Sequence, residues 1–270
     1  MKIVVTGPNG MLGQDLVPEL FKRGHDVIPV TSNDMDVTQY PEVKTCLGLI
    51  KPDMVIHTAA YTDVDDCEED PSTACNVNIT GTVNIADYCG ENKVKLIFIS
   101  TDHVFSGRGS ASRVAYRETH KAEPINVYGI TKLMGEKAIE QHLEEYYILR
   151  TSWLFGKGRR NYIDYYRESD ERILLPLSKS NPTSTLSLSR MISKIVTIQP
   201  EFGIYHAACT GSVFKSRVLQ KLNPNRPYTE SDSIGVPRPY NTSLDNSKLA
   251  RAIGQLPTWE ESLEEYLNGT

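Results

Sequence analysis

The sequence predicts an α/β protein, a Rossmann-type doubly wound parallel sheet with a small C-terminal substrate-binding lobe. Three observations support this class. Short apolar runs alternate with helix-like stretches through the first half of the 270 residues, a glycine-rich turn follows the first run, and the alternation weakens after Arg150. Strands that are separated by crossover helices pair in parallel and form sheets with helices on both faces.

The individual elements follow from the same alternation. Five strands are expected, at residues 3–5, 27–30, 54–58, 96–100 and 148–151, and the helices between them are expected at 11–22, 74–89 and 132–144. Later in the chain, proline and polar residues dominate 178–185 and 223–240, and helices are expected at 188–198 and 243–253. We therefore assign residues 1–150 to a dinucleotide-binding domain. Residues 151–270 are assigned mostly to the substrate-binding lobe, with segments that return to the sheet.

Composition and charge exclude several classes of function. With 29 basic and 34 acidic side chains the net charge is -5, which repels a polyanion, so we expect no nucleic-acid partner. The longest apolar runs are strand-sized, well short of the ~20 residues that a membrane-spanning helix needs, so we expect no membrane partner. The chain begins with a strand rather than a secretory signal, and its five cysteines form no C-x-x-C pair. A cytoplasmic protein with reduced thiols is the resulting expectation.

No metal site is expected. The acidic run over residues 63–70 invites comparison with a calcium loop, but the EF-hand pattern needs glycine at its sixth position, where this chain has Glu68. A solvated acidic turn that leads into a helix accounts for the run, because carboxylates are stabilised near a helix N-terminus. The six histidines are scattered and form no H-E-x-x-H pair.

A glycine-rich turn between the first strand and the first helix indicates a dinucleotide. The segment Gly7-Pro8-Asn9-Gly10-Met11-Leu12-Gly13 has G-x-x-G-x-x-G spacing. Gly7 permits the tight turn, Gly10 lets backbone N–H groups approach a pyrophosphate, and Gly13 allows the helix to pack closely on the strand. The N-terminus of the helix then supplies the positive end for the anion. A Walker A loop is excluded, because no Gly-Lys-Ser/Thr sequence closes the turn.

The residues after the second strand favour NADP(H) over NAD(H). An acidic residue at the end of this strand would bind the adenosine ribose 2′-hydroxyl and favour NAD(H). Ser32 lies here instead, and the next acidic residues are Asp34 and Asp36. Small hydroxyl side chains leave room for a 2′-phosphate but bring no charge to it. NADP(H) is therefore favoured, and NAD(H) remains an alternative.

A tyrosine and a lysine spaced for one helix face are the candidates for proton transfer. Tyr128 and Lys132 are four residues apart, so on a helix they lie one turn apart on the same face. A phenol has a pKa of about 10, and a neighbouring ammonium favours the phenolate that proton transfer produces. Ser100, Thr101 and Asp102 end a preceding strand, where a hydroxyl can hold a substrate carbonyl oxygen.

These motifs together resemble the extended short-chain dehydrogenase/reductases, and within them the dTDP-4-dehydrorhamnose reductase family. The similarity extends almost from end to end of the chain. It is carried by the glycine turn and by the segments His57-Thr58-Ala59-Ala60-Tyr61-Thr62-Asp63-Val64-Asp65, Ser100-Thr101-Asp102-His103-Val104-Phe105, Asn126-Val127-Tyr128-Gly129-Ile130-Thr131-Lys132-Leu133-Met134-Gly135-Glu136, Arg150-Thr151-Ser152-Trp153-Leu154-Phe155-Gly156, Arg238-Pro239 and Leu256-Pro257-x-Trp259.

The resemblance implies a cofactor site whose members each contact one part of the dinucleotide. Gly10, Met11 and Leu12 would hold the pyrophosphate, Asp36 and Val37 would flank the adenine, and Ala59, Ala60 and Tyr61 would line the nicotinamide side. The expected cofactor-binding set also includes Gly7, Asn9, Ser32 and Asn78, together with Tyr128 and Lys132.

The resemblance also implies a nucleoside-diphosphate sugar as substrate. Thr101 would hydrogen-bond the sugar carbonyl, Tyr128 would deliver the proton, and Lys132 would tune Tyr128 and hold the nicotinamide ribose. Asp102 and Trp153 are expected at the substrate, with Trp153 stacked near the sugar or the nucleotide. The candidate partners of the diphosphate are Lys157, Arg159, Arg160 and Arg238, and a solvated basic surface is the alternative for them.

Two departures from related sequences bear on the function. Relatives carry Asp-Gln-x-Gly-x-Pro-Thr in the lobe, where this chain has the shorter segment 178–183 without the acid, and this leaves the sugar nucleotide open. His103 occupies the position where sugar-nucleotide dehydratases place a glutamate, which argues against dehydration. We expect an NAD(P)H-dependent reduction of a 4-keto group, with a non-catalytic NADP-binding regulatory subunit and an epimerase as alternatives. The oligomeric state stays open, a homodimer included.

Overall fold

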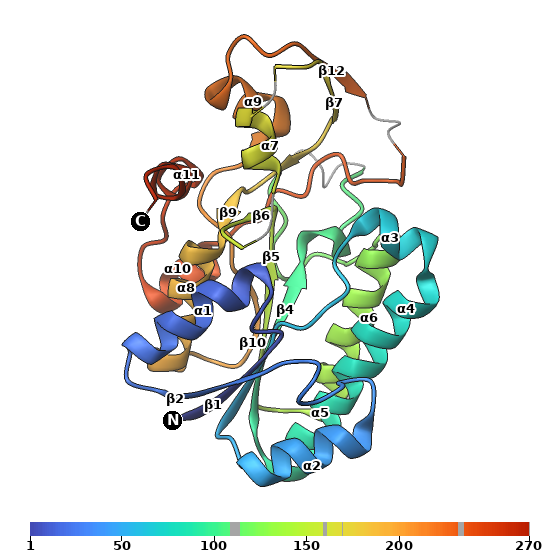
Figure 1. Ribbon diagram of the computed structural model, residues 1–270, viewed down its shortest axis with the longest axis vertical. Helices are drawn as coiled ribbons and strands as arrows, with labels where there is room; N and C mark the ends of the chain where they lie inside the picture. Colours follow the sequence, from blue (N-terminus) through green and yellow to red (C-terminus); the bar gives the residue numbers. More distant parts are fainter. Residues whose placement is uncertain (109–113, 159–160, 169, 232–234, 270) are drawn as a thin grey trace.

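The computed structural model describes residues 1–108, 114–158, 161–168, 170–231 and 235–269. Its central feature is a six-stranded sheet in which every described pair of neighbours is parallel (Figure 1). The strand order is β10-β5-β4-β3-β1-β2, and the strands are β1 (Lys2–Thr6), β2 (Asp26–Val30), β3 (Met54–His57), β4 (Lys95–Thr101), β5 (Tyr146–Thr151) and β10 (Gly203–His206). The predicted fold class and the five predicted strands are confirmed.

The sixth strand comes from the second half of the chain. β10 pairs in parallel with β5, with Tyr205 opposite Leu149. No strand is expected here from the sequence, because β10 has only four residues and two of them are Gly203 and His206. It is a strand because it completes the sheet edge beside β5, which no local pattern indicates.

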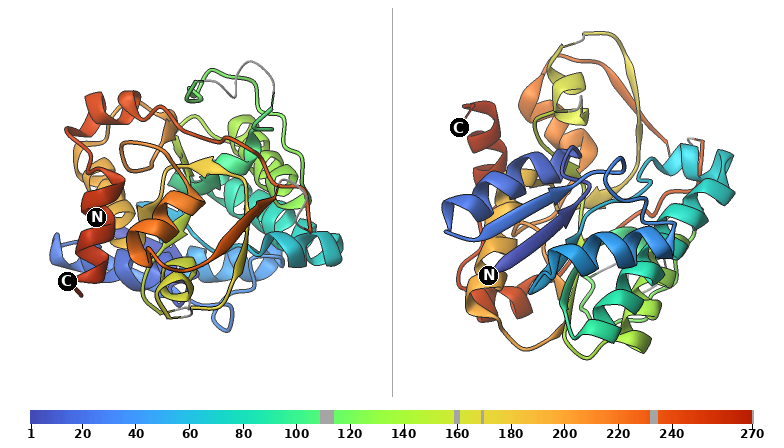
Figure 2. Two further views of the ribbon diagram at one scale, coloured as in Figure 1. Left: turned by 90° about the horizontal axis from the view of Figure 1, so that it is seen from above. Right: turned by 60° about the horizontal axis from the view of Figure 1, so that its bottom comes forward.

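Helices cover both faces of the sheet, which explains why its strands are almost uninterruptedly apolar. Ile3 and Val5 of β1 belong to the hydrophobic cluster on one face, whereas Val4 belongs to the cluster on the other. The first cluster includes residues of α1 (Met11–Lys22), α8 (Thr185–Ile198) and α10 (Ser247–Ile253), and the second includes residues of α2 (Tyr40–Ile50), α5 (Gly81–Asn92) and α6 (Val127–His142). The right-hand view of Figure 2, in which the bottom of the molecule comes forward, shows β1 and β2 between α1 and α2.

The boundaries of several helices differ from the prediction, each for a local reason. The side chain of Asn126 accepts a hydrogen bond from the N–H of Gly129 at 2.8 Å, so α6 begins at Val127 rather than at Lys132. The predicted helix 74–89 is divided into α4 (Pro71–Cys75), a π-helical turn (Asn76–Thr80) and α5. The predicted helix 243–253 begins only at Ser247, because the preceding segment pairs with other parts of the chain.

The acidic run is part of a helix. Residues Val64–Glu69 form α3, and the carboxylate of Asp63 caps it by accepting from the N–H groups of Asp65 and Asp66 at 2.9 and 3.2 Å. Asp63, Asp65 and Asp66 therefore lie before and in the first turn of the helix, where its positive end stabilises them, whereas Glu68 and Glu69 end the helix.

The lobe lies beyond the carboxyl ends of the strands, and its described residues include short strand pairs and helices (Figure 1). The pairs are β7 (Ile173–Pro176) with β12 (Tyr228–Ser231), β8 (Lys179–Ser180) with β11 (Val213–Phe214), and β6 (Leu154–Phe155) with β9 (Thr183–Ser184). The helices are α7 (Tyr162–Glu168) and α9 (Lys215–Leu222).

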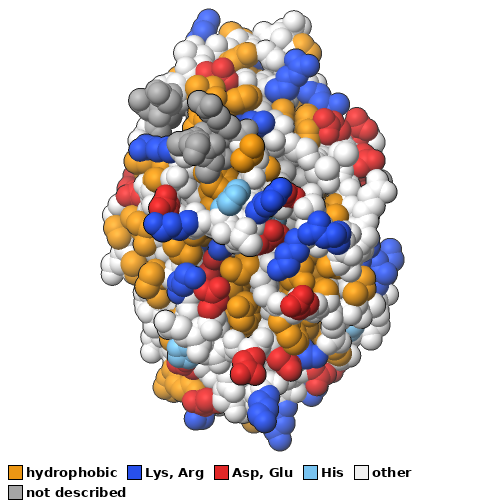
Figure 3. Space-filling view, turned by 180° about the vertical axis from the view of Figure 1, so that it is seen from behind, with side chains coloured by type: hydrophobic (Ala, Val, Ile, Leu, Met, Phe, Trp, Pro, Cys, Tyr) orange, Lys and Arg blue, Asp and Glu red, His pale blue; other side chains and the backbone are white. Residues whose placement is uncertain are grey.

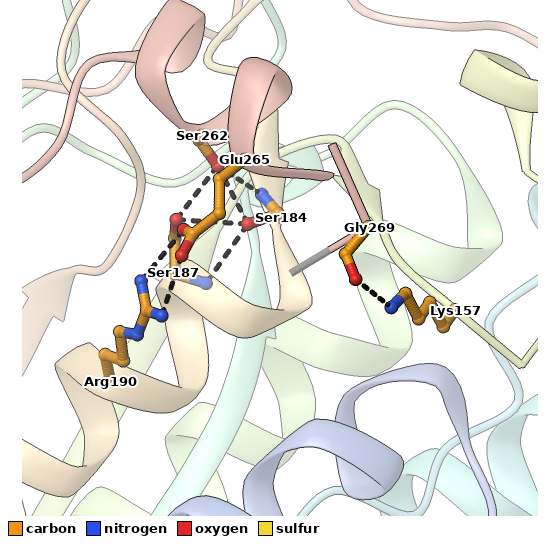
Figure 4. Close-up of polar contacts among 7 residues, drawn as sticks. All are labelled: Lys157, Ser184, Ser187, Arg190, Ser262, Glu265 and Gly269. Carbon is orange, nitrogen blue, oxygen red and sulfur yellow. Dashed lines mark hydrogen bonds and ion pairs between the residues drawn. The ribbon is translucent and has the colours of Figure 1, made fainter. Parts of the chain in front are cut away.

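The C-terminal helix α11 (Trp259–Leu267) fastens the end of the chain to α8 (Figure 4). The hydroxyl of Ser262 contacts those of Ser184 and Ser187, each at 2.9 Å, and Arg190 pairs with Glu265 at 2.7 Å. Figure 3 shows basic and acidic side chains interspersed over the face behind that of Figure 1.

Candidate active site

Two adjoining cavities lie at the carboxyl ends of the strands, where open α/β sheets bind ligands. The smaller, of about 370 Å³, extends from the glycine turn to the end of β2. The larger, of about 670 Å³, lies between the sheet and the lobe. Asn9, Gly10, Thr58 and Ala60 line both cavities, so together they form one elongated site.

The glycine turn has the geometry of an anion-binding turn. Gly7 has a φ of +64°, and its carbonyl accepts the N–H of Gly10 at 3.0 Å. A Cβ at position 13 would lie 2.5 and 2.6 Å from the carbonyl oxygens of Pro8 and Gly7, so only glycine lets α1 pack on the turn. The first turn of α1 has neither a side-chain cap nor an acidic residue, and its N–H groups are available for a phosphate. Met11 and Leu12, on this turn, line the larger cavity.

The end of β2 lines the smaller cavity with hydroxyl-bearing side chains. Ser32, Asp36 and Val37 all line it, as predicted for an adenosine site. The carboxylate of Asp36 accepts from the N–H and the hydroxyl of Thr38 at 2.9 and 2.8 Å, so it is engaged by its own loop. The structure thus brings the three predicted residues to one wall.

The segment after β3 is positioned by a buried asparagine. The Asn78 side chain is 1% exposed, accepts the N–H of Tyr61 at 2.8 Å and donates to the Tyr61 carbonyl at 2.9 Å. It also donates to the hydroxyl of Thr131 on α6 at 3.0 Å. Ala59 and Ala60 line the cavities, whereas Tyr61 and Asn78 are not among the described residues that do. Asn78 therefore holds the cavity wall in place, and direct contact of Tyr61 and Asn78 with a cofactor stays a prediction.

Thr101, Tyr128 and Lys132 converge in the larger cavity. Thr101 is the last residue of β4, and Tyr128 lies in the first turn of α6, which packs so closely on the turn after β4 that a Cβ at Gly129 would clash with the His103 carbonyl oxygen. Burial raises the pKa of the Tyr128 phenol well above its usual value, and its hydrogen bond with Thr101 partly offsets this. The phenol is therefore protonated at neutral pH and can donate.

Lys132 brings a positive charge into the same buried region. Its side chain is 2% exposed, and Nζ lies 4.0 Å from the centre of the Phe98 ring. Burial lowers the pKa of the Lys132 ammonium to about 7, and the Glu136 carboxylate acts in the opposite direction. In its charged form Lys132 would favour the phenolate form of Tyr128, and this role of Lys132 stays a prediction.

Asp102 and His103 form the wall next to Thr101. The Asp102 carboxylate accepts from the hydroxyls of Ser152 at 2.7 Å and Thr242 at 2.5 Å, so it joins the sheet to the lobe. The His103 ring lies edge-on to that of Tyr128, with centroids 5.8 Å apart. Burial lowers the pKa of His103, so its imidazole is neutral at pH 7.

Of the predicted diphosphate-binding cations, the structure places Arg238 in the cavity. Its guanidinium pairs with Asp65 of α3 at 2.8 Å. Lys157 is exposed and donates to the Gly269 carbonyl at 3.2 Å instead (Figure 4). Arg159 and Arg160 lie outside the described residues. Sequence reasoning missed another cation of the cavity, Lys215, because nothing in its local sequence distinguishes it from a surface lysine.

Trp153 lines the cavity from the segment between β5 and β6. Its backbone has a φ of +36°, a conformation that side-chain-bearing residues rarely adopt, and the Lys215 ammonium lies 5.3 Å from its ring centre. Strained backbone of this kind is concentrated at functional sites. The predicted position of Trp153 near the substrate is compatible with this placement.

With this geometry in view, the comparison with known proteins is specific. The family model "RmlD substrate binding domain" matches residues 1–270. The chain belongs to this family. The "dTDP-4-dehydrorhamnose reductase" of Streptomyces griseus is 33% identical over 97% of this chain and 91% of its own length. The "spore coat polysaccharide biosynthesis protein SpsK" of Bacillus subtilis is 30% identical over 98% of this chain and 96% of its own length.

A solved structure from this family is similar to this chain over its whole length. The crystal structure of dTDP-4-dehydrorhamnose reductase from Bacillus anthracis, in complex with NADP, superimposes with a TM-score of 0.91 at 31% identity. It covers 100% of this chain and 99% of that one. The similarity thus includes both the sheet and the lobe of this RmlD-family protein.

Proposed function

We propose that this protein is an oxidoreductase that reduces the 4-keto group of a nucleoside-diphosphate deoxysugar, with dTDP-4-dehydrorhamnose as substrate and dTDP-L-rhamnose as product. The convergence of Thr101, Tyr128 and Lys132 in a cavity that adjoins the glycine turn carries the proposal. The full-length similarity to dTDP-4-dehydrorhamnose reductases supports it.

NADPH is the proposed hydride donor. The hydroxyl side chain of Ser32 at the end of β2 and the uncapped first turn of α1 fit a cofactor with a 2′-phosphate and a pyrophosphate. The related Bacillus anthracis structure is a complex with NADP. When bound, the cofactor supplies the hydride that forms the new C–H bond at C4 of the sugar. NAD(H) remains the alternative cofactor.

The residues of this chain supply the proton and the positioning. Thr101 holds the sugar carbonyl oxygen next to the Tyr128 phenol, and Tyr128 donates its proton to that oxygen as the C–H bond forms. The Lys132 ammonium stabilises the phenolate that remains, and solvent reprotonates it. The donated proton and the hydride together convert the ketone to a secondary alcohol.

An assay of the purified protein with a panel of keto-sugar nucleotides tests the proposal. We expect the absorbance of NADPH to fall when dTDP-4-dehydrorhamnose is added. In a parallel assay with NADH as the donor, we expect the absorbance of NADH to fall more slowly. No oxidation of NADPH or NADH with any member of the panel would refute it and favour the regulatory-subunit alternative. Tightly bound NAD in the purified protein, with interconversion of two sugar nucleotides and no net oxidation, would favour the epimerase.

A cytoplasmic location and a homodimer belong to the proposal as expectations. All five cysteines lie in the described part of the chain and are free, which suits a reducing compartment. Within the described residues no helix is long and apolar enough to cross a membrane. Light scattering of the purified protein measures its oligomeric state.

A further inference from the structure

Lys215 is held in the larger cavity by the lobe itself. It is the first residue of α9 and directly follows β11, which pairs with β8 in antiparallel register, Phe214 opposite Lys179. Its N–H donates to the Ser178 carbonyl at 3.2 Å. The backbone of Lys215 is therefore anchored to the segment 178–183, the part of the lobe in which the sequence departs from related proteins.

The Lys215 ammonium lies against two aromatic rings and has no carboxylate partner among the described ion pairs. Nζ lies 5.0 Å from the centre of the Tyr162 ring and 5.3 Å from that of Trp153, and no described ion pair includes it. Burial and the nearby Arg238 guanidinium lower the pKa of Lys215 to about 8, and the charge of Asp102 opposes this. Position 215 is also at the positive end of α9, where a basic residue is disfavoured.

Lys215 and Arg238 face the same corner of the cavity. Both charges lower the pKa of His103, whose ring lies against Tyr128. Arg238 is engaged by Asp65 at 2.8 Å and by the Val236 carbonyl at 3.2 Å. Of these two cations, Lys215 is therefore the one without a described carboxylate partner.

Two buried hydroxyl groups beside Lys215 also lack partners. Ser178 and Ser180 are 9% and 5% exposed, both line the cavity, and neither Oγ has a hydrogen-bond partner in the described part of the chain. Hydroxyl donors next to a cation suit a phosphate, which offers several acceptor oxygens.

The nucleotide sugar itself separates the reacting carbonyl from the diphosphate. In a hexose bound with its C4 carbonyl at Thr101 and Tyr128, C1 and its diphosphate lie on the opposite side of the ring. Lys215 and Arg238 come from the lobe half of the chain and line the same cavity as Thr101, which ends β4 of the sheet. We propose that Lys215 binds the diphosphate of the nucleotide sugar and, with Arg238 and the hydroxyls of Ser178 and Ser180, selects diphosphate-bearing substrates. The inference rests on the proposed function for its substrate class.

Binding of thymidine compounds to the protein saturated with NADP⁺ tests Lys215 without turnover. Titration calorimetry with dTDP, dTMP and thymidine should show that Lys215→Met weakens dTDP binding about 10- to 100-fold and changes thymidine binding less than about twofold. Arg217→Met, the matched control, removes one charge from an exposed position of the same helix and should leave the dTDP affinity unchanged.

The melting temperature separates this role from a structural one. Because Lys215 is an unfavourable cation in the free protein, Lys215→Met should melt at the same or a higher temperature than the wild type while binding dTDP more weakly. Lys215→Arg should retain dTDP binding. Equal dTDP affinity of the wild type and Lys215→Met, equal loss of dTDP and thymidine binding, or no dTDP binding by the wild type would each overturn the inference.

The pH dependence provides a second readout. Asp102, His103, Tyr162 and Arg238 face Lys215 and contribute in both the wild type and Lys215→Arg, whereas only the lysine loses its charge near pH 8. The dTDP affinity of the wild type should therefore fall further than that of Lys215→Arg between pH 7 and pH 9, and identical profiles would count against the role. The two proposals can fail separately. If dTDP binds through Lys215 but no keto-sugar nucleotide is reduced, the proposed function fails and this inference stands. If reduction occurs with the same KM in Lys215→Met, only this inference fails.

Discussion

The guanidinium of Arg150 binds both carboxylate oxygens of Glu136, with Nε–Oε1 and Nη2–Oε2 distances of 2.9 and 2.6 Å. The side chains of Arg150 and Glu136 are 4% and 1% exposed. Glu136 lies one helical turn after Lys132 on α6, and its Oε1 also accepts the hydroxyl of Ser100 at 2.5 Å. The pair thus fastens the helix that carries Tyr128 and Lys132 to β4 and β5.

Arg150→Met should therefore destabilise the fold strongly. It leaves the Glu136 carboxylate buried without its counter-ion, which typically costs about 3–5 kcal/mol. Arg190→Met is the control, because it breaks the pair with Glu265, whose side chains are 46% and 26% exposed, and should cost less than about 1 kcal/mol. Urea unfolding measures both, and equal losses in the two variants would contradict the buried pair's role.

Tyr128→Phe should abolish most turnover and spare cofactor binding. The substitution removes the proton donor while keeping the ring, and general-acid catalysis contributes about 10²- to 10⁴-fold to a rate. The expected kcat falls by at least about 10²-fold, with the Kd for NADPH, measured by its fluorescence, within about twofold of the wild type. Tyr146→Phe, at the start of β5 and outside the described cavity walls, should keep its activity. A Tyr128→Phe enzyme of unchanged kcat would remove Tyr128 from the mechanism.

Acid should destabilise the protein through its buried neutral histidines. His206 is 0% exposed, and burial, followed by the charge of Arg150, lowers its pKa to about 3. In the unfolded chain this imidazole is protonated below a pKa of about 6.5, so the unfolded state binds more protons between these values. The free energy of unfolding should therefore fall as pH decreases from 6.5, by up to about 1.4 kcal/mol per pH unit for each such histidine.

Substitution of one histidine tests this sign. Asn can replace the Nδ1 contact that His206 makes with the Asp245 carbonyl at 3.2 Å, so His206→Asn should unfold with a shallower slope between pH 6.5 and pH 4. His142→Asn is the control, because it removes a histidine whose side chain is 38% exposed and lies against Asp87 rather than in the core. Urea unfolding over this pH range gives the slopes. A wild-type slope retained in His206→Asn would show that other groups dominate.

Two glycine-to-alanine variants should differ in their effects on NADPH binding and on stability. At Gly13 the new Cβ meets the carbonyl oxygens of Pro8 and Gly7 at 2.5 and 2.6 Å, so Gly13→Ala must displace the turn and weaken NADPH binding at least about tenfold. At Gly48, within α2, the Cβ meets no atom within 4 Å. Gly48→Ala should raise the free energy of unfolding by about 0.5–1 kcal/mol and leave NADPH binding unchanged. Fluorescence titration and urea unfolding compare them.

Local sequence patterns were sufficient to predict the parts of the site that are formed by residues close together in the sequence. The glycine turn is built from seven consecutive residues, and Tyr128 and Lys132 share a helix face because they are four residues apart. The apolar runs of β1 to β5 were recognisable because both of their faces are buried. Helix ends were less predictable, since α6 begins five residues early on the cap that Asn126 provides.

The rest of the site depends on segments that are far apart in sequence. Asp102 meets Thr242 across 140 residues, and Asn78 meets Thr131 across 53. No pattern around Lys215 separates it from a surface lysine, and Lys157, which the basic cluster had favoured, contacts the C-terminal segment instead. Such contacts are decided by how the lobe folds back over the sheet, which local propensity does not encode.

The sequence by itself determined the fold class, the dinucleotide turn and the Tyr128–Lys132 pair, because each is a short-range pattern with a fixed steric or helical period. Only the tertiary structure decided which cations reach the cavity, which strand completes the sheet, and how far burial shifts the pKa values of Tyr128, Lys132 and Lys215. The physical reason is that desolvation and Coulomb interactions depend on three-dimensional distances between residues, and these distances arise when remote segments pack together.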